Sequence, residues 1–441
     1  MLVCTFMESK KTTLNGFKSK ILIITYYWPP SGGSGVQRWM YFAKYLKKLG
    51  YLPFVITVDE SRASYPVLDH SLNEEIKDLR VIKTRTFEPL KWYSRIITGD
   101  QKIGIPQGEV KTNNLFMKLA AYIRGNFFVP DARKGWINFA YRAAFNLIKE
   151  EKIKKIITTG PPHSTHLVGL RLKKYYDFNW WVDLRDPWTD IFYNTSLYRT
   201  KKTISKDEKL EKQVIQNANG VITTAGGILI DKLKLKAPNQ KFVTLPNGYD
   251  SRLMKVTKSL PKKNGFHIVY TGLLTENQSY RVLLEVLKKL SNYYRICFTI
   301  AGNINPNIIN EIKYKIPKAD FEYLGYLPHS KAVALMKSAD LLCNFIFNEA
   351  ENQMISGKLL EYLATEIPIL CIGSPDTDTS KFLLEATNVC VAKDHEKNII
   401  EDYIKKLLDF EKKPKNKSPN IKNWSRDEIT KRLIKEVLLE S

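Results

Sequence analysis

Short apolar runs rich in β-branched residues recur along this chain, and most of them are followed by a turn and a helical pattern. The first run, residues 21–24, precedes a glycine-rich turn at 31–35 and helical spacing at 36–49, and residues 54–57 form the next run. Apolar strands that alternate with helices are typical of parallel sheets buried on both faces. The pattern therefore predicts an α/β fold built on doubly wound parallel sheets.

The alternation occurs in two series, which are separated by a polar and basic segment containing Pro261. The expected strands are 21–24, 54–57, 153–158, 180–184, 220–224 and 242–245 in the first series, and 267–270, 296–301, 321–324, 341–345, 368–372 and 389–391 in the second. A chain of 441 residues also exceeds the size at which one core usually keeps growing. We therefore expect two Rossmann-like domains, residues 18–250 and 265–423, that face each other across a cleft and are joined by a linker at 251–264.

The two ends of the chain differ from the domains. Residues 1–17 show neither pattern, and their apolar stretch is too short for a signal peptide, so we expect a disordered leader there. In residues 424–441, apolar side chains such as Ile429, Leu433 and Val437 recur at helical spacing. We expect a C-terminal helix that covers a groove on either domain or crosses back to the first domain.

The charge balance points to an anionic partner. The chain has 69 Lys and Arg against 45 Asp and Glu, which gives a formal net charge of +24. A nucleotide, a membrane surface and a nucleic acid each fit that sign. Between residues 81 and 136 the alternation fails, and basic and aromatic residues gather at 91–128 instead. This composition suits an anionic membrane interface and a lipid-linked acceptor, although an ordinary insertion packed on the first domain is the alternative.

Cysteine usage and hydropathy indicate a cytoplasmic protein. The five cysteines are scattered without a C-x-x-C pair: Cys4, Cys297, Cys343, Cys371 and Cys390. Such scattering favours buried, reduced thiols over disulfides or metal ligands. No apolar run approaches the ~20 residues that a membrane-spanning helix needs. With the basic stretch, these features predict a cytoplasmic protein attached peripherally to the inner face of the cytoplasmic membrane.

Polar side chains follow two expected strands of the first series. Asp183, Arg185 and Asp186 come at the end of the fourth strand, and His163 comes shortly after the third. The carboxyl ends of parallel strands face the ligand crevice in open α/β sheets. We expect the first three residues to orient a substrate hydroxyl in catalysis, and His163 to bond a sugar hydroxyl or a phosphate. An Asp/Arg pair that only satisfies a turn, and a capping histidine, are the alternatives.

The glycine-rich turn after the first strand is a candidate phosphate site. Gly32 and Gly33 allow a ligand to approach the backbone closely, and the helix that follows offers free N–H groups and the positive end of its dipole. The spacing differs from the dinucleotide fingerprint G-x-G-x-x-G. We expect contact with a phosphate or a sugar, and a plain tight turn is the alternative.

A second phosphate-binding pattern opens a helix in the second domain. Ser356 and Gly357 would present the helix N-terminus to a diphosphate, and Lys358 would add a point charge. Glu361 lies three residues later on the same helix face, where a carboxylate suits ribose hydroxyls. The segment therefore predicts a site for a nucleoside diphosphate, and a solvated Lys–Glu ion pair is the alternative. The sequence contains no His/Cys cluster with zinc spacing.

Four segments in this order resemble the retaining glycosyltransferase family 4, which has the GT-B fold, and especially its bacterial surface-polysaccharide branch. They are residues 27–38, 183–188, 245–250 and 357–364, and the resemblance spans nearly the whole chain. It implies transfer of a sugar from a nucleotide-diphosphate sugar to a hydroxyl of a glycan or lipid-linked glycan acceptor. It further implies retained anomeric configuration and a role in surface polysaccharide biosynthesis.

The resemblance also implies where the substrates bind. The donor would bind to the second domain and the acceptor mainly to the first, with no metal ion and no other cofactor. Glu361 resembles the glutamate that holds the donor ribose, while Gly32 and Gly33 resemble the loop that lies over the donor phosphates and sugar. Residues 246–248 look like the junction between the two domains.

The chain departs from the family pattern in two places. Gln353 stands where the family has the second carboxylate of a glutamate pair, which leaves open the group that stabilises the developing positive charge on the sugar. Around Gly272, after the first strand of the second domain, the basic pair of many members is absent. Arg281 is the candidate substitute, and Lys358 is left as the best phosphate cation.

Two other functions fit parts of the sequence. A sugar-nucleotide epimerase could use the same double fold without an acceptor. A basic nucleic-acid- or membrane-binding protein without catalysis would account for the charge. The sequence shows no recognition helix or base-stacking motif, so we expect no nucleic-acid partner.

Overall fold

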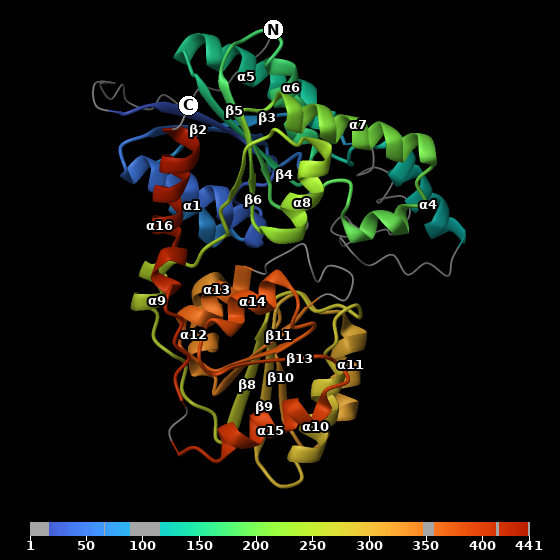
Figure 1. Ribbon diagram of the computed structural model, residues 1–441, viewed down its shortest axis with the longest axis vertical. Helices are drawn as coiled ribbons and strands as arrows, with labels where there is room; N and C mark the ends of the chain where they lie inside the picture. The colour runs from blue at the N-terminus through green and yellow to red at the C-terminus, as the bar shows by residue number, and fades with distance from the viewer. Residues whose placement is uncertain (1–16, 66, 89–114, 347–356, 412–413, 440–441) are drawn as a thin grey trace.

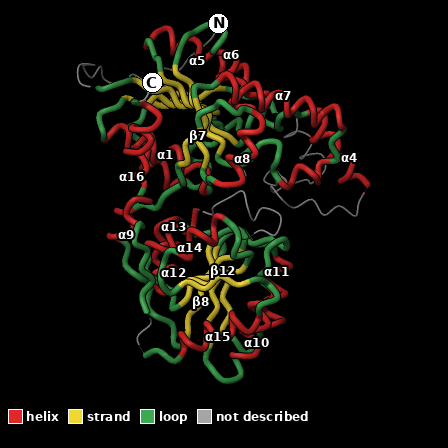
Figure 2. The backbone as a smooth tube through the Cα atoms, viewed as in Figure 1, coloured by secondary structure: helices red, strands yellow, loops and turns green. Residues whose placement is uncertain are grey.

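The computed structural model describes residues 17–65, 67–88, 115–346, 357–411 and 414–439. These residues form two domains that follow one another along the long axis of the molecule (Figure 1). Each domain has a parallel sheet as its middle layer and helices on both faces (Figure 2). The leader was predicted at residues 1–17, and residues 1–16 lie outside the described residues.

The first domain contains a seven-stranded sheet in the order β3-β2-β1-β4-β5-β6-β7, and all neighbours pair in parallel. The strands are β1 (Lys20–Ile24), β2 (Leu52–Val58), β3 (Arg80–Thr84), β4 (Lys155–Gly160), β5 (Asn179–Leu184), β6 (Gly220–Thr223) and β7 (Phe242–Thr244). The helices are α1 (Ser34–Lys48), α2 (Asn73–Ile76), α4 (Leu115–Phe127), α5 (Ile137–Glu151), α6 (Ser164–Leu172), α7 (Lys201–Asn217) and α8 (Gly227–Lys236). In the register of the sheet, Ile23 of β1 lies between Val55 of β2 and Ile157 of β4.

The second domain contains a six-stranded parallel sheet in the order β10-β9-β8-β11-β12-β13. The strands are β8 (Phe266–Thr271), β9 (Ile296–Ala301), β10 (Asp320–Tyr323), β11 (Leu341–Phe345), β12 (Ile369–Ile372) and β13 (Val389–Ala392). The helices are α10 (Arg281–Leu290), α11 (Pro306–Lys315), α12 (His329–Ser338), α13 (Gly357–Ala364), α14 (Asp378–Leu384) and α15 (Lys397–Leu408). The strand order reverses at β1/β4 in the first sheet and at β8/β11 in the second, where doubly wound sheets open a crevice for ligands.

The strand β1 shows why apolar, β-branched runs predicted this architecture. Successive side chains of a strand point to opposite faces of its sheet. Leu22 and Ile24 join the core that contains Ala140 and Ala144 of α5, whereas Ile21 and Ile23 join the core beneath α1. A strand that must bury both faces therefore needs apolar residues at every position, and this requirement produces the uninterrupted run.

The C-terminal helix α16 (Arg426–Leu433) and the π-helical turn Ile434–Leu438 cross back to the first domain and lie beside α1 (Figure 1). Ile429, Leu433 and Val437 are buried in the same core as Trp39. The expected linker, residues 251–264, contains a short helix, α9 (Ser251–Val256), which Asp250 caps by accepting a 2.9 Å hydrogen bond from the Leu253 amide. Two segments therefore connect the domains, α9 on the way out and the segment before α16 on the way back.

The prediction that the alternation fails between residues 81 and 136 was wrong at its edges, because β3 and α4 lie partly or wholly in this interval. The strand β3 is at the edge of the sheet and is only half-buried, so Arg80 and Lys83 interrupt the apolar run that marks the other strands. The sequence also predicted no helix at the positions of α5, α11 and α14.

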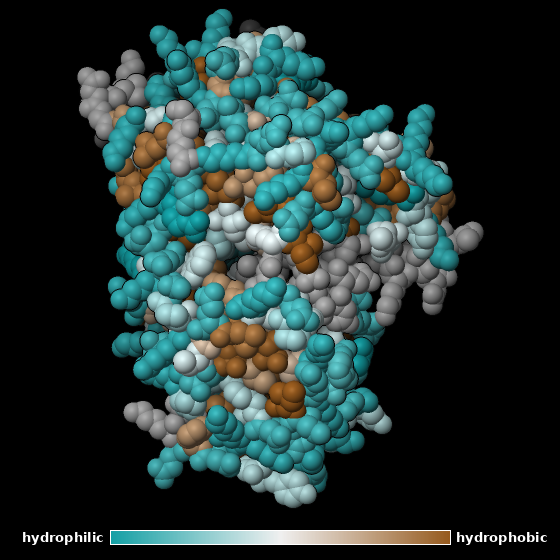
Figure 3. Space-filling view, in the orientation of Figure 1, coloured by the Kyte–Doolittle hydropathy of each residue, from teal (hydrophilic) through white to brown (hydrophobic). Residues whose placement is uncertain are grey.

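The described helices, surface and thiols bear on the predictions from hydropathy and cysteine usage. None of the described helices is long and apolar enough to cross a membrane. The face in Figure 3 is mainly hydrophilic, with a hydrophobic patch on the second domain. Cys297, Cys343 and Cys371 are buried and Cys390 is half-buried, and all four thiols are free. Cys4 lies outside the described residues.

Candidate active site

A buried ion pair joins the strand ends of the first domain. Asp183, at the end of β5, has no exposed surface, and its Oδ1 accepts a 2.7 Å hydrogen bond from Arg38 Nη2. Its Oδ2 accepts from Trp39 Nε1 at 2.6 Å and from Thr159 Oγ1 at 2.7 Å. Arg38 also donates to the Leu245 carbonyl at 2.7 Å, so it binds α1 to the end of β7. Protein groups thus occupy both oxygens of Asp183, and its contacts are those of a structural residue rather than of one that orients a substrate hydroxyl.

Arg185 and Asp186 lie beside the start of α1. A Cβ atom at Gly35 would lie 1.6 Å from Arg185 Nη1, so the guanidinium lies directly against the first turn of α1 and would have to move if Gly35 had a side chain. Arg185 Nη2 donates to Asp186 Oδ2 at 3.1 Å, and both side chains are 17% exposed. A guanidinium next to a helix N-terminus places two positive groups together, and this arrangement favours an anionic ligand.

The glycine-rich turn contacts the second domain. Gly33 has a φ of +100°, a conformation that favours glycine, and it ends the turn just before α1. At Gly32 an added Cβ would lie 3.0 Å from Val67 and 3.2 Å from the hydroxyl of Tyr326 in the second domain. The Tyr326 hydroxyl also donates to Asp69 Oδ2 across the two domains at 3.3 Å. The turn therefore lies where the two domains meet.

Lys358, in the first turn of α13, has no counterion in the part of the chain that the structure describes. Its Nζ lies 3.8 Å from the centroid of the Tyr270 ring, and a Cβ at Gly272, whose φ is +118°, would lie 3.6 Å from this Nζ. Among the described residues, Lys358 makes no hydrogen bond or ion pair. Burial lowers the pKa of Lys358 to about 7. A half-buried ammonium in this environment would gain stability from a bound anion.

Glu361 lies one turn further along α13 and is 8% exposed. Its Oε1 lies 2.7 Å from His329 Nε2 and 3.6 Å from Arg426 Nη2. Burial raises the pKa of Glu361, but His329 and Arg426 outweigh burial and hold that pKa below its usual value. Oε2 has no hydrogen-bond partner in the described part of the chain. The residue is therefore an oriented carboxylate with one oxygen available to a ligand, and it does not form the solvated pair with Lys358 that the sequence left open.

The start of α13 also touches the first domain. A Cβ at Gly357 would lie 3.3 Å from Nδ2 of Asn247, which belongs to the segment that follows β7. Arg38 Nη1 lies 3.4 Å from Oδ1 of the same asparagine. Lys358 and Glu361 are thus on the face of the second domain that meets the first, at the same junction as the glycine-rich turn.

Arg281, one of the predicted donor-site residues, does not lie with this cluster. Arg281 is about half exposed and pairs twice with Glu311, through Nε at 2.7 Å and Nη2 at 2.9 Å. Its planar fork matches that carboxylate, so the expected substitute for the missing basic pair is already occupied on the outer surface of α10 and α11. Ser356 and Gln353 lie outside the described residues.

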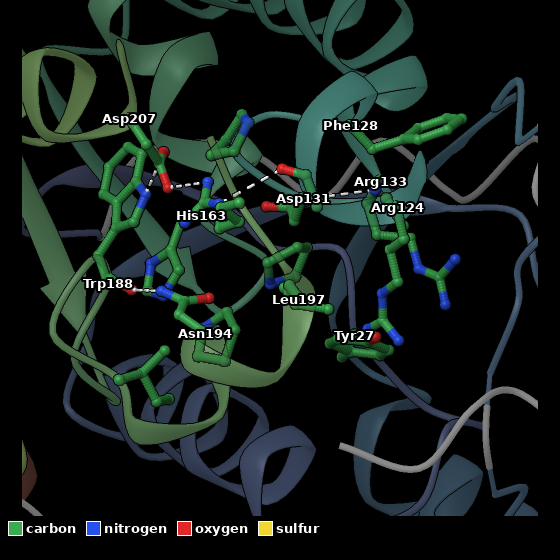
Figure 4. A pocket seen from close by; sticks show the side chains of 17 residues that line it. Tyr27, Arg124, Phe128, Asp131, Arg133, His163, Trp188, Asn194, Leu197 and Asp207 are labelled. Carbon is green, nitrogen blue, oxygen red and sulfur yellow. Dashed lines mark hydrogen bonds and ion pairs between the residues drawn. The ribbon is translucent and has the colours of Figure 1, made fainter. Parts of the chain in front are cut away.

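His163 lines a pocket in the first domain (Figure 4). It is 6% exposed and stacks on Trp188 with ring centroids 5.0 Å apart and planes 7° apart. Neither ring nitrogen makes a hydrogen bond of standard geometry. Burial, His166 and Arg185 hold the pKa of His163 well below its usual value, so the ring is neutral and offers one donor and one acceptor. The pocket is completed mainly by aromatic and charged side chains, among them Tyr27, Arg124, Phe128, Asp131, Arg133, Asn194 and Asp207.

Sequence reasoning missed His329, Tyr326 and Arg426. Each of them is distant in sequence from the group that it contacts, and none stands in a motif. The one available signal was the apolar spacing of the C-terminal helix, which predicted that its first turn would lie on another element. Spacing alone did not show which charged group would meet Arg426.

Among the described residues, no group of three or more His, Cys, Asp or Glu side chains is placed to hold a metal ion. The groups described at the junction are Lys358, Arg185, Gly32, Gly33 and Glu361, whose Oε1 already has protein partners. This set supplies positive charge and backbone donors for an anion, together with one acceptor for hydroxyl groups.

Comparison with known proteins gives a family match for part of the chain and similar solved structures for most of it. Residues 254–424 match the family model described as glycosyl transferases group 1. No sequence among the curated proteins matches the chain. Among solved structures, a glycosyltransferase from Rickettsia africae is 15% identical with a TM-score of 0.60, covering 97% of this chain and all of that one.

Two further structures are similar over most of the chain. Sucrose-phosphate synthase from Thermosynechococcus elongatus is 13% identical with a TM-score of 0.64, covering 96% of this chain and 100% of that one. Anabaena HepE in complex with UDP-glucose is 11% identical with a TM-score of 0.61 and the same coverages, 96% and 100%. At these identities the likeness establishes the fold. The chain therefore has the GT-B fold, and residues 254–424 carry the match to the glycosyl transferases of group 1.

Proposed function

We propose that the protein is a retaining glycosyltransferase of bacterial surface polysaccharide biosynthesis. It moves a sugar from a nucleotide-diphosphate sugar to a hydroxyl of a glycan or lipid-linked glycan acceptor. The observation that carries this proposal is the pair on α13: within the described residues, Lys358 has no counterion and Glu361 has one carboxylate oxygen without a partner. A nucleoside diphosphate presents the complementary groups, because it has an anion at one end and ribose hydroxyls towards the other.

In this proposal the donor lies between the two domains. Lys358 and the N-terminus of α13 bind the diphosphate, the glycine-rich turn covers it from the first domain, and Glu361 accepts hydrogen bonds from the ribose. As the bond to the sugar breaks, negative charge grows on the leaving diphosphate, and these preorganised groups stabilise it. We propose that they take the place of a metal ion, as the family resemblance implies.

The pocket of Figure 4 is the proposed acceptor site. Its neutral His163 can donate one hydrogen bond to a hydroxyl and accept another from it, and the aromatic side chains of Tyr27 and Phe128 suit the faces of sugar rings. The acceptor hydroxyl would attack from the side on which the diphosphate departs, which retains the anomeric configuration. Arg185 and Asp186 lie at the start of α1, where they would face both substrates.

The donor experiment is a screen of nucleotide sugars, UDP-glucose among them, for thermal stabilisation of the full chain. A ligand that binds only the folded state raises its melting temperature. Stabilisation by at least one nucleotide sugar, with release of its nucleoside diphosphate when a glycan acceptor is added, would support the proposal. Donor consumption that does not depend on the acceptor would indicate an epimerase or a hydrolase instead.

We also propose peripheral attachment to an anionic membrane from the cytoplasmic side. The support is the formal net charge of +24 together with the exposed apolar side chains on α4, in which Leu119 is 53%, Tyr122 40% and Phe127 65% exposed. Most of the basic and aromatic stretch 91–128 lies outside the described residues. Flotation with anionic and with neutral liposomes at moderate salt tests this proposal. Binding to anionic vesicles alone is expected, and no binding to either kind would refute it.

A further inference from the structure

Arg426 is a buried cation that touches both domains. It is the first residue of α16 and is 6% exposed, and its Nη2 donates to Gln37 Oε1 of α1 at 2.9 Å. Its guanidinium carbon lies 3.9 Å from the centroid of the Tyr41 ring, also in α1. The same Nη2 lies 3.6 Å from Glu361 Oε1 of α13. One side chain of the last helix therefore connects α1 of the first domain with the proposed ribose-binding carboxylate of the second.

The backbone fixes the position from which this side chain extends. The Arg426 amide donates to the Tyr249 carbonyl at 2.9 Å, and the Tyr249 amide donates to the Trp424 carbonyl at 3.2 Å. One turn later, Ile429 is buried in the core beneath α1. The start of α16 is thus held on two sides, and the guanidinium has little freedom to leave Glu361.

The hydrogen bonding of Arg426 is incomplete in a way that folding alone does not explain. Nε and Nη1 are buried and have no hydrogen-bond partner among the described residues. Unpaired buried donors cost stability, and an arginine selected only for stability would be expected to use them. Among the described ion pairs, Glu361 is the one carboxylate that Arg426 approaches. The side chain therefore lies close to the Glu361 carboxylate, although two of its own N–H groups lack partners among the described residues.

Glu361 gains a fixed orientation from this arrangement. Its Oε1 lies between His329 and Arg426, whereas its Oε2 has no partner in the described part of the chain. A carboxylate held through one oxygen presents the other in a defined direction. Hydroxyl groups of a ligand would then meet an acceptor that is already oriented, which lowers the cost of ordering on binding.

We propose that Arg426 is a positioning residue for the nucleotide donor, which holds Glu361 through Oε1 so that Oε2 accepts hydrogen bonds from ribose hydroxyls. This inference rests on the proposed function, because the ribose contact of Glu361 is part of that proposal. The C-terminal helix then belongs to the donor site although it packs on the first domain. Movement of the two domains apart would release Glu361 and weaken the grip on the ribose.

The test separates ribose recognition from general damage. UDP, GDP and ADP are titrated calorimetrically into the full chain, and the tightest of the three is compared with its 2′,3′-dideoxy analogue. In the wild type, loss of the ribose hydroxyls should weaken binding about tenfold or more, since hydrogen bonds to a charged group are lost. In Arg426→Ala the same loss should weaken binding less than about threefold, because Glu361 no longer presents Oε2 correctly. A general loss of stability would lower both affinities and leave their ratio unchanged.

Two further variants keep the test decisive. Lys431→Ala removes an exposed lysine of the same helix, which pairs only with Glu428 at the surface, and should keep the wild-type ratio. Arg426→Lys keeps a cation near Glu361 and should restore part of the discrimination, which also covers the case in which the alanine variant does not fold.

Each remaining outcome has one meaning. A wild-type ratio in both Arg426 variants would overturn the positioning role. If Glu361→Ala loses the discrimination while Arg426→Ala keeps it, the proposed function stands and only the role of Arg426 fails. If none of the three nucleoside diphosphates binds the wild type, the proposed function fails and this inference fails with it.

Discussion

The two domains place buried charges at their facing strand ends in opposite ways. In the first domain, Asp183 and Arg38 neutralise each other, and every oxygen of the carboxylate has a protein partner. In the second, Lys358 has no counterion among the described residues and Glu361 keeps one oxygen open. The difference indicates that a charged group facing the other domain is available to a ligand only when protein groups do not already satisfy its hydrogen bonds and its charge. The first pair secures the architecture, and the second is available for a ligand.

The largest expected effect is on stability. Asp183→Ala leaves Arg38 buried without its carboxylate, which should lower the free energy of unfolding by about 3–5 kcal/mol. Urea denaturation of the purified variant measures this loss. Asp186→Ala is the matched control, because its ion pair with Arg185 is partly exposed and should contribute less than about 1 kcal/mol. Wild-type stability with lost turnover in Asp183→Ala would instead make this residue a substrate contact.

The next effect is on turnover. Lys358→Met removes the cation that stabilises the leaving diphosphate, so kcat should fall roughly 10²-fold. The free energy of unfolding should stay the same or rise, because the variant also removes a half-buried ammonium that has no counterion among the described residues. Steady-state kinetics and denaturation of the same preparation measure the two quantities. Unchanged kcat in a folded variant would remove Lys358 from the mechanism.

A smaller effect is expected from pH. The pKa of Lys358 is about 7 in the free protein, so the side chain loses its charge as the pH rises above 7. A bound diphosphate favours the ammonium and raises this pKa, so binding at pH 8 should take up a proton. Affinity should then fall by up to about tenfold per pH unit above 7. Calorimetry in two buffers of different ionisation enthalpy measures the proton uptake, and Lys358→Met accounts for the titration of the ligand itself. Absence of any difference between wild type and variant would contradict the prediction.

The smallest expected effect is that of Arg281, a cation of the second domain that already has a counterion, on nucleotide affinity. Arg281 is satisfied by Glu311 at the surface, so Arg281→Ala should change the affinity for a nucleoside diphosphate by no more than about twofold. The titrations used for Lys358 measure this directly. A loss greater than about tenfold would reassign Arg281 as the phosphate cation, in place of Lys358.

The sequence predicted the strands of both sheets well because a strand buried on both faces requires an uninterrupted apolar run. The glycine-rich turn was equally visible, since Gly33 has a positive φ that favours glycine and Arg185 packs directly against Gly35. Its role as a phosphate contact stays a prediction. The edge strand β3 escaped notice because one side of an edge is exposed, so polar residues such as Lys83 carry no penalty there.

The sequence could not show which group each charged side chain would pair with. Asp183 and Arg185 are two residues apart in the same motif, yet one is buried against Arg38 and the other lies at the start of α1. In the sequence Arg281 looked available for a phosphate, but in the structure its guanidinium pairs with Glu311, thirty positions further along. These outcomes depend on which groups the packing of distant elements brings within hydrogen-bond distance.

The sequence by itself therefore determined the double α/β fold, the glycine-rich turn and the residue types at the start of α13, because each of these follows from local backbone and burial requirements. Only the tertiary structure decided which charges are satisfied and which are open. Hydrogen bonds and ion pairs act over a few ångströms, and the atoms that meet at Glu361 come from α12, α13 and α16, which are separated in the sequence and meet only through tertiary packing.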